Sequence, residues 1–175
     1  MLNLKSLKSS EEIQNNFRLI NDIPVQYYNL NSNTTRWNQA SIITVASPLF
    51  QNATEALLYL LKKEALIQDR WKPDWNISHP DISAFTNALQ IWGRFSNYQG
   101  SSILIDTFWK DFHATVTAIS QQKEFEFHLN HKLVPFQIPL NKSEIIQVYC
   151  FDHNWNEHNF FIQTRINWIL YSWLV

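Results

Sequence analysis

EIIQVYCFD at residues 144–152, then HNWNEHN at 153–159 and FFIQTRINWILYSWLV at 160–175, is the stretch that decides the fold. The first part is short and rich in β-branched and aromatic residues, which predicts a strand. The polar second part predicts a connection, and the third a long return segment. Exposed aromatic side chains gain nothing from folding, so the apolar end must be buried. We therefore expect residues 144–175 to form the centre of the sheet and of the core.

A second β segment precedes this one, because the apolar period changes to two from Lys123 onward. Residues 124–129 alternate strictly, residues 130–131 make a plausible two-residue turn, and residues 132–140 return. Pro135 and Pro139 in the return predict an edge strand. The alternation points Phe125, Phe127 and Leu129 toward the core, and Glu124, Glu126 and His128 outward.

Helices are predicted by capping residues followed by apolar positions three and four apart. They span residues 9–22, 53–69, 80–92 and 102–122, and Asn52 with Glu55 caps the second. Residues 25–30 predict an edge strand and residues 41–46 a buried one. The prediction is a single α+β domain over residues 1–175. Its helices lie in the first two-thirds and pack on one face of a C-terminal antiparallel β-meander.

Composition narrows the functional classes. The chain has two glycines, which leaves no glycine-rich phosphate loop or dinucleotide fingerprint. A net charge of −1 and scattered lysines and arginines argue against a nucleic-acid partner. Cys150 is the single cysteine, and we expect it to be a buried, inert thiol. Without a signal-peptide-like start or a membrane-length apolar run, the prediction is a cytoplasmic protein with no membrane partner.

Catalysis is the weaker functional hypothesis. Four of the six histidines lie in the meander near several carboxylates, but their spacing matches no metal-binding motif. Glu124 and Glu126 point the same way about 7 Å apart along the strand, as paired acids in a hydrolase could. We expect no catalytic residues, no metal and no cofactor. The alternative is a small hydrolase or metal-dependent enzyme that uses carboxylates and histidines of the meander: His128, His131, His153 and His158.

A binding surface is the stronger hypothesis. Residues 124–175 carry five acidic residues against three basic ones, and an acidic surface with an exposed aromatic residue suits a basic protein partner. In general character alone, the chain is similar to small bacterial immunity or antitoxin proteins, which would imply that it neutralises a toxin domain by direct binding. Trp155 is the expected anchor. The predicted partner-binding residues are Glu124, Glu126, His128, Asp152, His153, Trp155 and Glu157.

Overall fold

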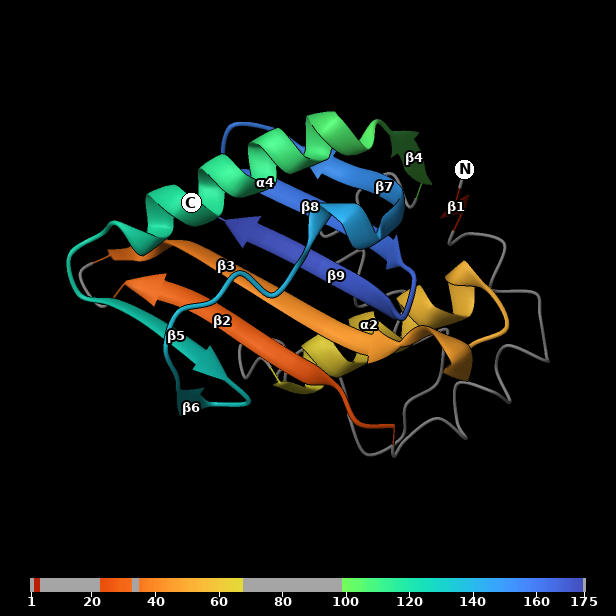
Figure 1. Cartoon of the computed structure of the whole chain (residues 1–175), viewed down its shortest axis with the longest axis horizontal. Coiled ribbons are helices and arrows are strands. Elements are labelled where there is room, and N and C mark those ends of the chain that lie inside the picture. Colours follow the sequence, from red (N-terminus) through yellow and green to blue (C-terminus); the bar gives the residue numbers. More distant parts are fainter. Residues whose placement is uncertain (1, 4–22, 33–34, 68–98, 175) are drawn as a thin grey trace.

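The structure, a computed structural model, describes residues 2–3, 23–32, 35–67 and 99–174. These residues form an antiparallel sheet with two α-helices (Figure 1). The strand order is β1-β4-β7-β8-β9-β3-β2-β5-β6. The strands are β1 (Leu2–Asn3), β2 (Gln26–Ser32), β3 (Thr35–Ala46), β4 (Gln99–Ile103), β5 (Phe125–Leu129), β6 (Lys132–Leu133), β7 (Ile145–His153), β8 (Glu157–Thr164) and β9 (Asn167–Leu174). The helices are α2 (Ala53–Ile67) and α4 (Ile105–Ser120), with short 3₁₀ turns η2 (Ser47–Leu49) and η4 (Lys142–Glu144).

The C-terminal strand β9 lies at the centre of the sheet, between β8 and β3, as predicted. The prediction of a single long return segment over residues 160–175 is wrong, because the chain reverses between β8 and β9. The Thr164 hydroxyl makes this turn: it accepts a hydrogen bond from Asn167 N at 2.9 Å and donates one to Asn167 O at 3.0 Å. A threonine hydroxyl can close a turn by hydrogen bonding to nearby backbone groups, and no glycine or proline marks this reversal in the sequence, so the signal for it is weak.

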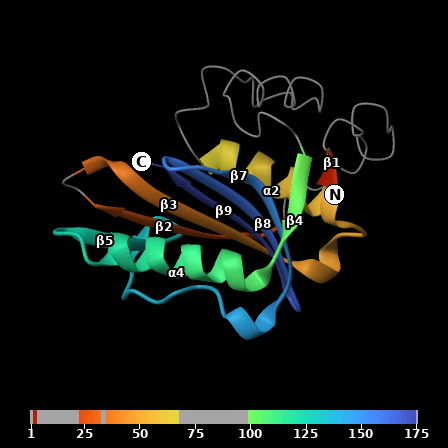
Figure 2. The same ribbon diagram turned by 90° about the horizontal axis from the view of Figure 1, so that it is seen from above.

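The two helices lie on opposite faces of the sheet, not on one face as predicted (Figure 2). The reason is visible in the central strands, which are apolar at consecutive positions rather than at alternate ones. A strand buried on both faces has this pattern. The α2 side buries Ile43, Phe161 and Leu170, whereas the α4 side buries their neighbours Ile42, Phe160 and Tyr171.

Both helices form within the ranges that the sequence predicts, but α4 begins at Ile105 rather than at residue 102, because Ser102 and Ile103 belong to β4. Asn52 Oδ1 accepts a hydrogen bond from Glu55 N at 3.0 Å, and the Glu55 carboxylate accepts one from Gln51 N at 3.0 Å. The first bond is the N-cap contact that the capping pattern predicts, whereas the carboxylate reaches the amide of the residue before the N-cap rather than that of Asn52 itself. The inward side chains of α4 are Phe108, Phe112, Val116 and Ile119. The predicted helices at residues 9–22 and 80–92 lie outside the described residues.

The fold is α+β, but the order of helices first and meander last is wrong. Strands β2 and β3 come from the N-terminal third of the chain and pair with strands from the C-terminal third. The predicted edge strand at residues 25–30 is confirmed as a strand, but it lies inside the sheet between β3 and β5. The return after β5 does lie at the sheet edge, although β6 is only two residues long and ends before Pro135.

Candidate functional site

The hairpin tip between β7 and β8 presents one large aromatic side chain to solvent. Trp155 is 84% exposed, the highest fraction among the large exposed hydrophobic residues of the described ranges. Asn154 holds the tip in shape. Its side-chain oxygen accepts hydrogen bonds from Asn156 N at 3.1 Å and Glu157 N at 2.8 Å. Its backbone N–H donates a hydrogen bond to Glu157 O at 2.9 Å. The loop chemistry therefore fixes the backbone that carries the indole.

Two predicted carboxylates are fixed beside this tip by one buried amide. Asn159 is fully buried, and its Nδ2 donates to Asp152 Oδ2 at 3.1 Å and to Glu157 Oε1 at 2.6 Å. An irregularity in β7 between Cys150 and Asp152 brings Asp152 opposite Asn159. Hydrogen bonds to ionised groups are among the stronger ones in proteins, so both acids are held in defined positions. Three predicted residues, Asp152, Trp155 and Glu157, thus lie together.

His153 belongs to a second cluster on the opposite, α4-facing side of the sheet. Its Nε2 lies 3.2 Å from Asp111 Oδ2 of α4, and its ring centroid lies 4.6 Å from that of His158. The His158 ring in turn lies 4.5 Å from Trp173. Burial lowers the pKa of His158 below its ordinary 6.5, and the nearby His153 lowers it further, against smaller opposing effects of Asp111 and of a hydrogen bond with the Asn154 backbone.

The sequence prediction of partner-binding residues did not include Asp111 and His158. The partnership of His158 with His153 could have been found by counting outward from the hairpin tip, since strand partners pair in register. Asp111 could not have been found in this way. Its place depends on how α4 packs across the sheet, and helical spacing alone does not give that arrangement.

Two of the remaining predicted residues, Glu126 and His128, lie on β5, which four strands separate from β7. Glu126 and His128 share one face, with 3.7 Å between His128 Nε2 and Glu126 Oε2, as the alternation predicts. Glu124 does not continue that face. It precedes β5 and has a left-handed backbone with φ of 60°, so the strand geometry used to pair Glu124 with Glu126 is wrong.

The strand register relates the two groups of predicted residues. One continuous row of polar side chains crosses six strands and ends at His128 on β5 and Asp152 on β7. Five strand spacings separate these ends by about 24 Å. The middle of the row is buried. The structure therefore forms no single compact patch from all seven residues. In order, the row is His128, Asn29, Ser41, Ser172, Asn159 and Asp152.

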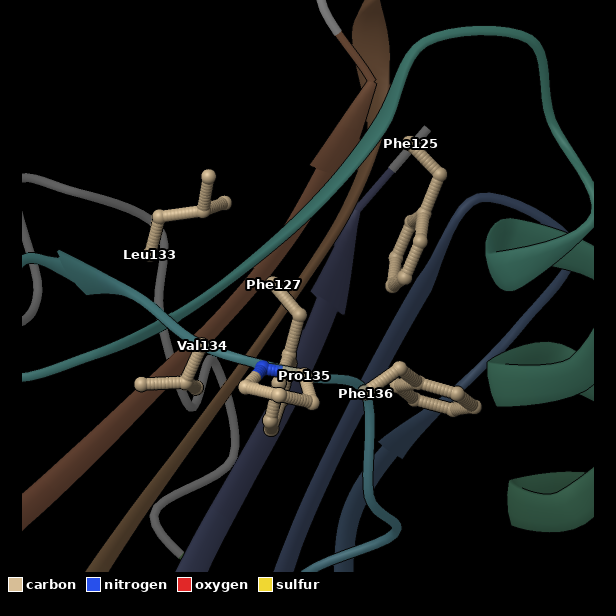
Figure 3. Close-up of a pocket in the computed structure, with 6 residues that line it drawn as sticks. All are labelled: Phe125, Phe127, Leu133, Val134, Pro135 and Phe136. Atoms are coloured by element: carbon tan, nitrogen blue, oxygen red, sulfur yellow. The ribbon is translucent and has the colours of Figure 1, made fainter.

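A separate apolar hollow of about 360 Å³ opens beside β5 and β6 (Figure 3). Phe136, one of its lining residues, packs edge-to-face against Phe125 and Phe127, with ring centroids 5.3 and 5.5 Å apart. Only apolar side chains line it, so it offers no group for chemistry. Its lining residues are Phe125, Phe127, Leu133, Val134, Pro135 and Phe136.

The histidines of the meander do not assemble into one site. Strands β5 and β7 run in opposite directions in the sheet, so the turn carrying His131 and the tip after His153 point toward opposite ends. Among the described residues, no group of three or more His, Cys, Asp or Glu side chains is arranged to hold a metal ion. No helix in the described ranges is long and apolar enough to span a membrane. The chain matches no protein-family model, no curated protein and no solved structure.

Proposed function

We propose that this chain is a non-catalytic protein-binding domain of the immunity or antitoxin type, which neutralises a toxin partner by direct binding. The β7–β8 hairpin is the contact surface. The single observation that carries the proposal is Trp155, 84% exposed on a tip that hydrogen bonds hold in one shape. Tryptophan is the residue type most enriched among interface residues that dominate binding energy. A rigid tip also reduces the ordering cost of association.

The chemistry of the tip favours a basic partner. Asp152 and Glu157 keep fixed positions beside Trp155 because Asn159 holds both carboxylates. Fixed negative charges around an aromatic anchor attract a positively charged surface and define its orientation. A toxin that acts on nucleic acid needs such a basic surface for its own substrate, so a basic toxin domain is the proposed occupant. A cytoplasmic location is part of the same proposal.

The proposal is tested by capture followed by measurement with the identified protein. Tagged chain is used to retain partners from the native lysate, and the retained protein is then purified. Its affinity for the chain is measured by calorimetry, and its own activity is assayed with and without the chain. Trp155→Ala should weaken binding by about 2 kcal/mol or more and should abolish the inhibition. Glu157→Lys should weaken it as well, because the charge is reversed beside the anchor.

Ile166→Ala is the matched control. Ile166 is also an exposed apolar residue in a hairpin turn, at 60% exposure, but its turn joins β8 to β9 at the opposite end of the sheet. This variant should bind as the unchanged chain does. If Trp155→Ala retains full affinity while Ile166→Ala loses it, the contact surface lies elsewhere. If the captured protein keeps its activity in the complex, neutralisation is wrong.

A small hydrolase remains the second candidate, and one observation favours it. Asp111 lies 3.2 Å from His153, and a carboxylate in that position can orient an imidazole as a general base. A panel of ester, amide and glycoside substrates tests this candidate directly. Turnover that disappears in His153→Ala and persists in Trp155→Ala would replace the binding proposal with an enzymatic one.

A further inference from the structure

His153 and His158 form the last strand pair before the hairpin tip, directly below Trp155. Their ring centroids are 4.6 Å apart, and the three tip residues 154–156 connect the two strands above them. Any charge repulsion between these two rings therefore acts at the base of the tip.

We propose that the His153–His158 pair makes the hairpin tip pH dependent: the tip is closed while the pair carries at most one proton and opens when it takes up a second. The consequence for a partner, release in acid, rests on the proposed function of the hairpin. The behaviour of the tip itself does not. Histidine is the side chain whose charge ordinarily changes between about pH 5 and 8.

Within the part of the chain that the structure describes, the first proton has a counter-charge and the second has none of its own. A proton on His153 faces Asp111 Oδ2 at 3.2 Å. A second proton on His158 would place two positive rings side by side against that single carboxylate. Asp152 and Glu157 are close in sequence, but both are hydrogen-bonded to Asn159 on the other face of the sheet.

The burial of His158 also opposes a charge there, and it outweighs the smaller opposite effects of Asp111 and of the hydrogen bond with the Asn154 backbone. The residue is 9% exposed, and its buried Nδ1 has no hydrogen-bond partner among the described residues. From β9 it meets Trp173, and from its own strand Phe160. Tyr171, farther along the same side of β9, stacks on Phe160, and its phenol is neutral throughout this pH range because burial only raises its pKa further above the ordinary 10.0. A charged His158 would be hydrated only if the tip opened.

Amide hydrogen exchange of the free chain tests the proposal. The Asn154 and Glu157 amides donate the hydrogen bonds that close the tip. After correction for intrinsic rates, their protection should fall about tenfold or more between pH 7.5 and 5.0, the change that corresponds to one pKa unit of coupling. The Asn167 amide, bonded to Thr164 Oγ1 in the β8–β9 turn, is the internal control and should keep its protection.

Variants separate the histidine pair from other acid effects. His153→Gln and His158→Gln each leave one imidazole at the tip and should remove the fall in protection. His131→Gln, which changes an exposed histidine of the β5–β6 turn, should retain it. Unchanged protection in the wild-type chain overturns the proposal, as does a fall that survives in His153→Gln. Because His153 is half-exposed, that variant is decisive even if His158→Gln does not fold.

Binding measurements then separate the two proposals. With the partner identified by capture, wild-type affinity should fall about tenfold or more from pH 7.5 to 5.0, and His153→Gln should show no such fall. If no partner is captured, the exchange experiment still decides the behaviour of the tip. If exchange shows opening and affinity does not change with pH, the hairpin is not the contact surface.

Discussion

Gly100 of β4 lies directly against the ring of Phe151 of β7. A Cβ atom at position 100 would come within 2.7 Å of the Phe151 Cζ atom, closer than carbon atoms pack. Phe151 is itself buried, at 8% exposure, next to the strand irregularity that precedes Asp152. The glycine is therefore required by a neighbouring side chain.

Gly100→Ala should lower the free energy of unfolding by about 1–3 kcal/mol, the usual cost of overpacking. Urea denaturation measures this loss of unfolding free energy, and Ser101→Ala at the next, exposed position is the control. Phe151→Leu shortens the opposing side chain and should reduce the cost of adding the methyl group. Equal costs in the two backgrounds would show that the contact is not the cause.

The β5–β6 turn supplies a matched pair of glycine substitutions. Asn130 and His131 both have left-handed backbones, with φ of 48° and 66°. His131→Gly should raise the free energy of unfolding by about 1 kcal/mol by removing the side-chain clash of that conformation. Asn130→Gly should not stabilise, because Asn130 Oδ1 accepts a hydrogen bond from Tyr27 N at 2.9 Å. Thermal denaturation distinguishes the two variants. Equal shifts of the melting temperature in both would contradict the different roles given to Asn130 and His131.

Asn159→Asp should destabilise the chain at neutral pH. The change replaces an amide that donates to Asp152 and Glu157 with a third carboxylate in a fully buried position. Burial and two like charges raise the pKa of the new carboxyl in the folded state above its unfolded value. The loss should therefore shrink as pH falls from 7 toward 5, because protonation favours the folded form. A loss that does not change with pH would show that Asp152 and Glu157 are not the cause. Urea denaturation across this range measures it.

His158 should make global stability fall on acidification. Its pKa is lower in the folded state than its ordinary 6.5, mainly because of burial. The unfolded chain therefore binds more protons below pH 6.5, so stability is full above that pH and declines as pH falls toward the folded-state pKa. His158→Gln should flatten this part of the stability profile. The same slope in that variant would assign the effect to other groups.

Cys150 should react slowly with thiol reagents. It is half-buried, less than predicted, and burial followed by the charge of Asp152 raises its pKa from 9.0 to about 11. Two pKa units correspond to about a hundredfold lower thiolate fraction at pH 8. Reaction with a colorimetric disulfide reagent should accelerate by at least that factor on denaturation. Rapid reaction in the folded state would show an exposed thiolate.

Local patterns in the sequence are sufficient to predict both described helices, several of the strands and part of the site, but not β4 or the division of residues 160–174 between β8 and β9. The capping pair Asn52 and Glu55 and the alternation through Phe127 depend on neighbours within a few residues. Asp152, Trp155 and Glu157 were found together because one hairpin holds all three. Glu126 was placed in the same patch wrongly, since only strand order shows that four strands lie between β5 and β7. Asp111 could not be assigned to the site from the sequence, because its position depends on how α4 packs across the sheet. The placement of helices on both faces could have been predicted, because consecutive apolar residues such as Ile42 and Ile43 indicate strands that are buried on both faces.

The central position of β9 has a kinetic consequence. Its partner β3 contributes residues 39–46, which lie more than 120 positions earlier in the chain. Pairings between such distant segments must close a large loop before they gain any contact, and chains dominated by them fold slowly. The β7–β8–β9 hairpins are local and can form early, but the sheet stays divided until β3 docks on β9. Refolding should therefore be limited by that docking, and substitutions at the β3–β9 junction should slow it more than substitutions at the hairpin tips.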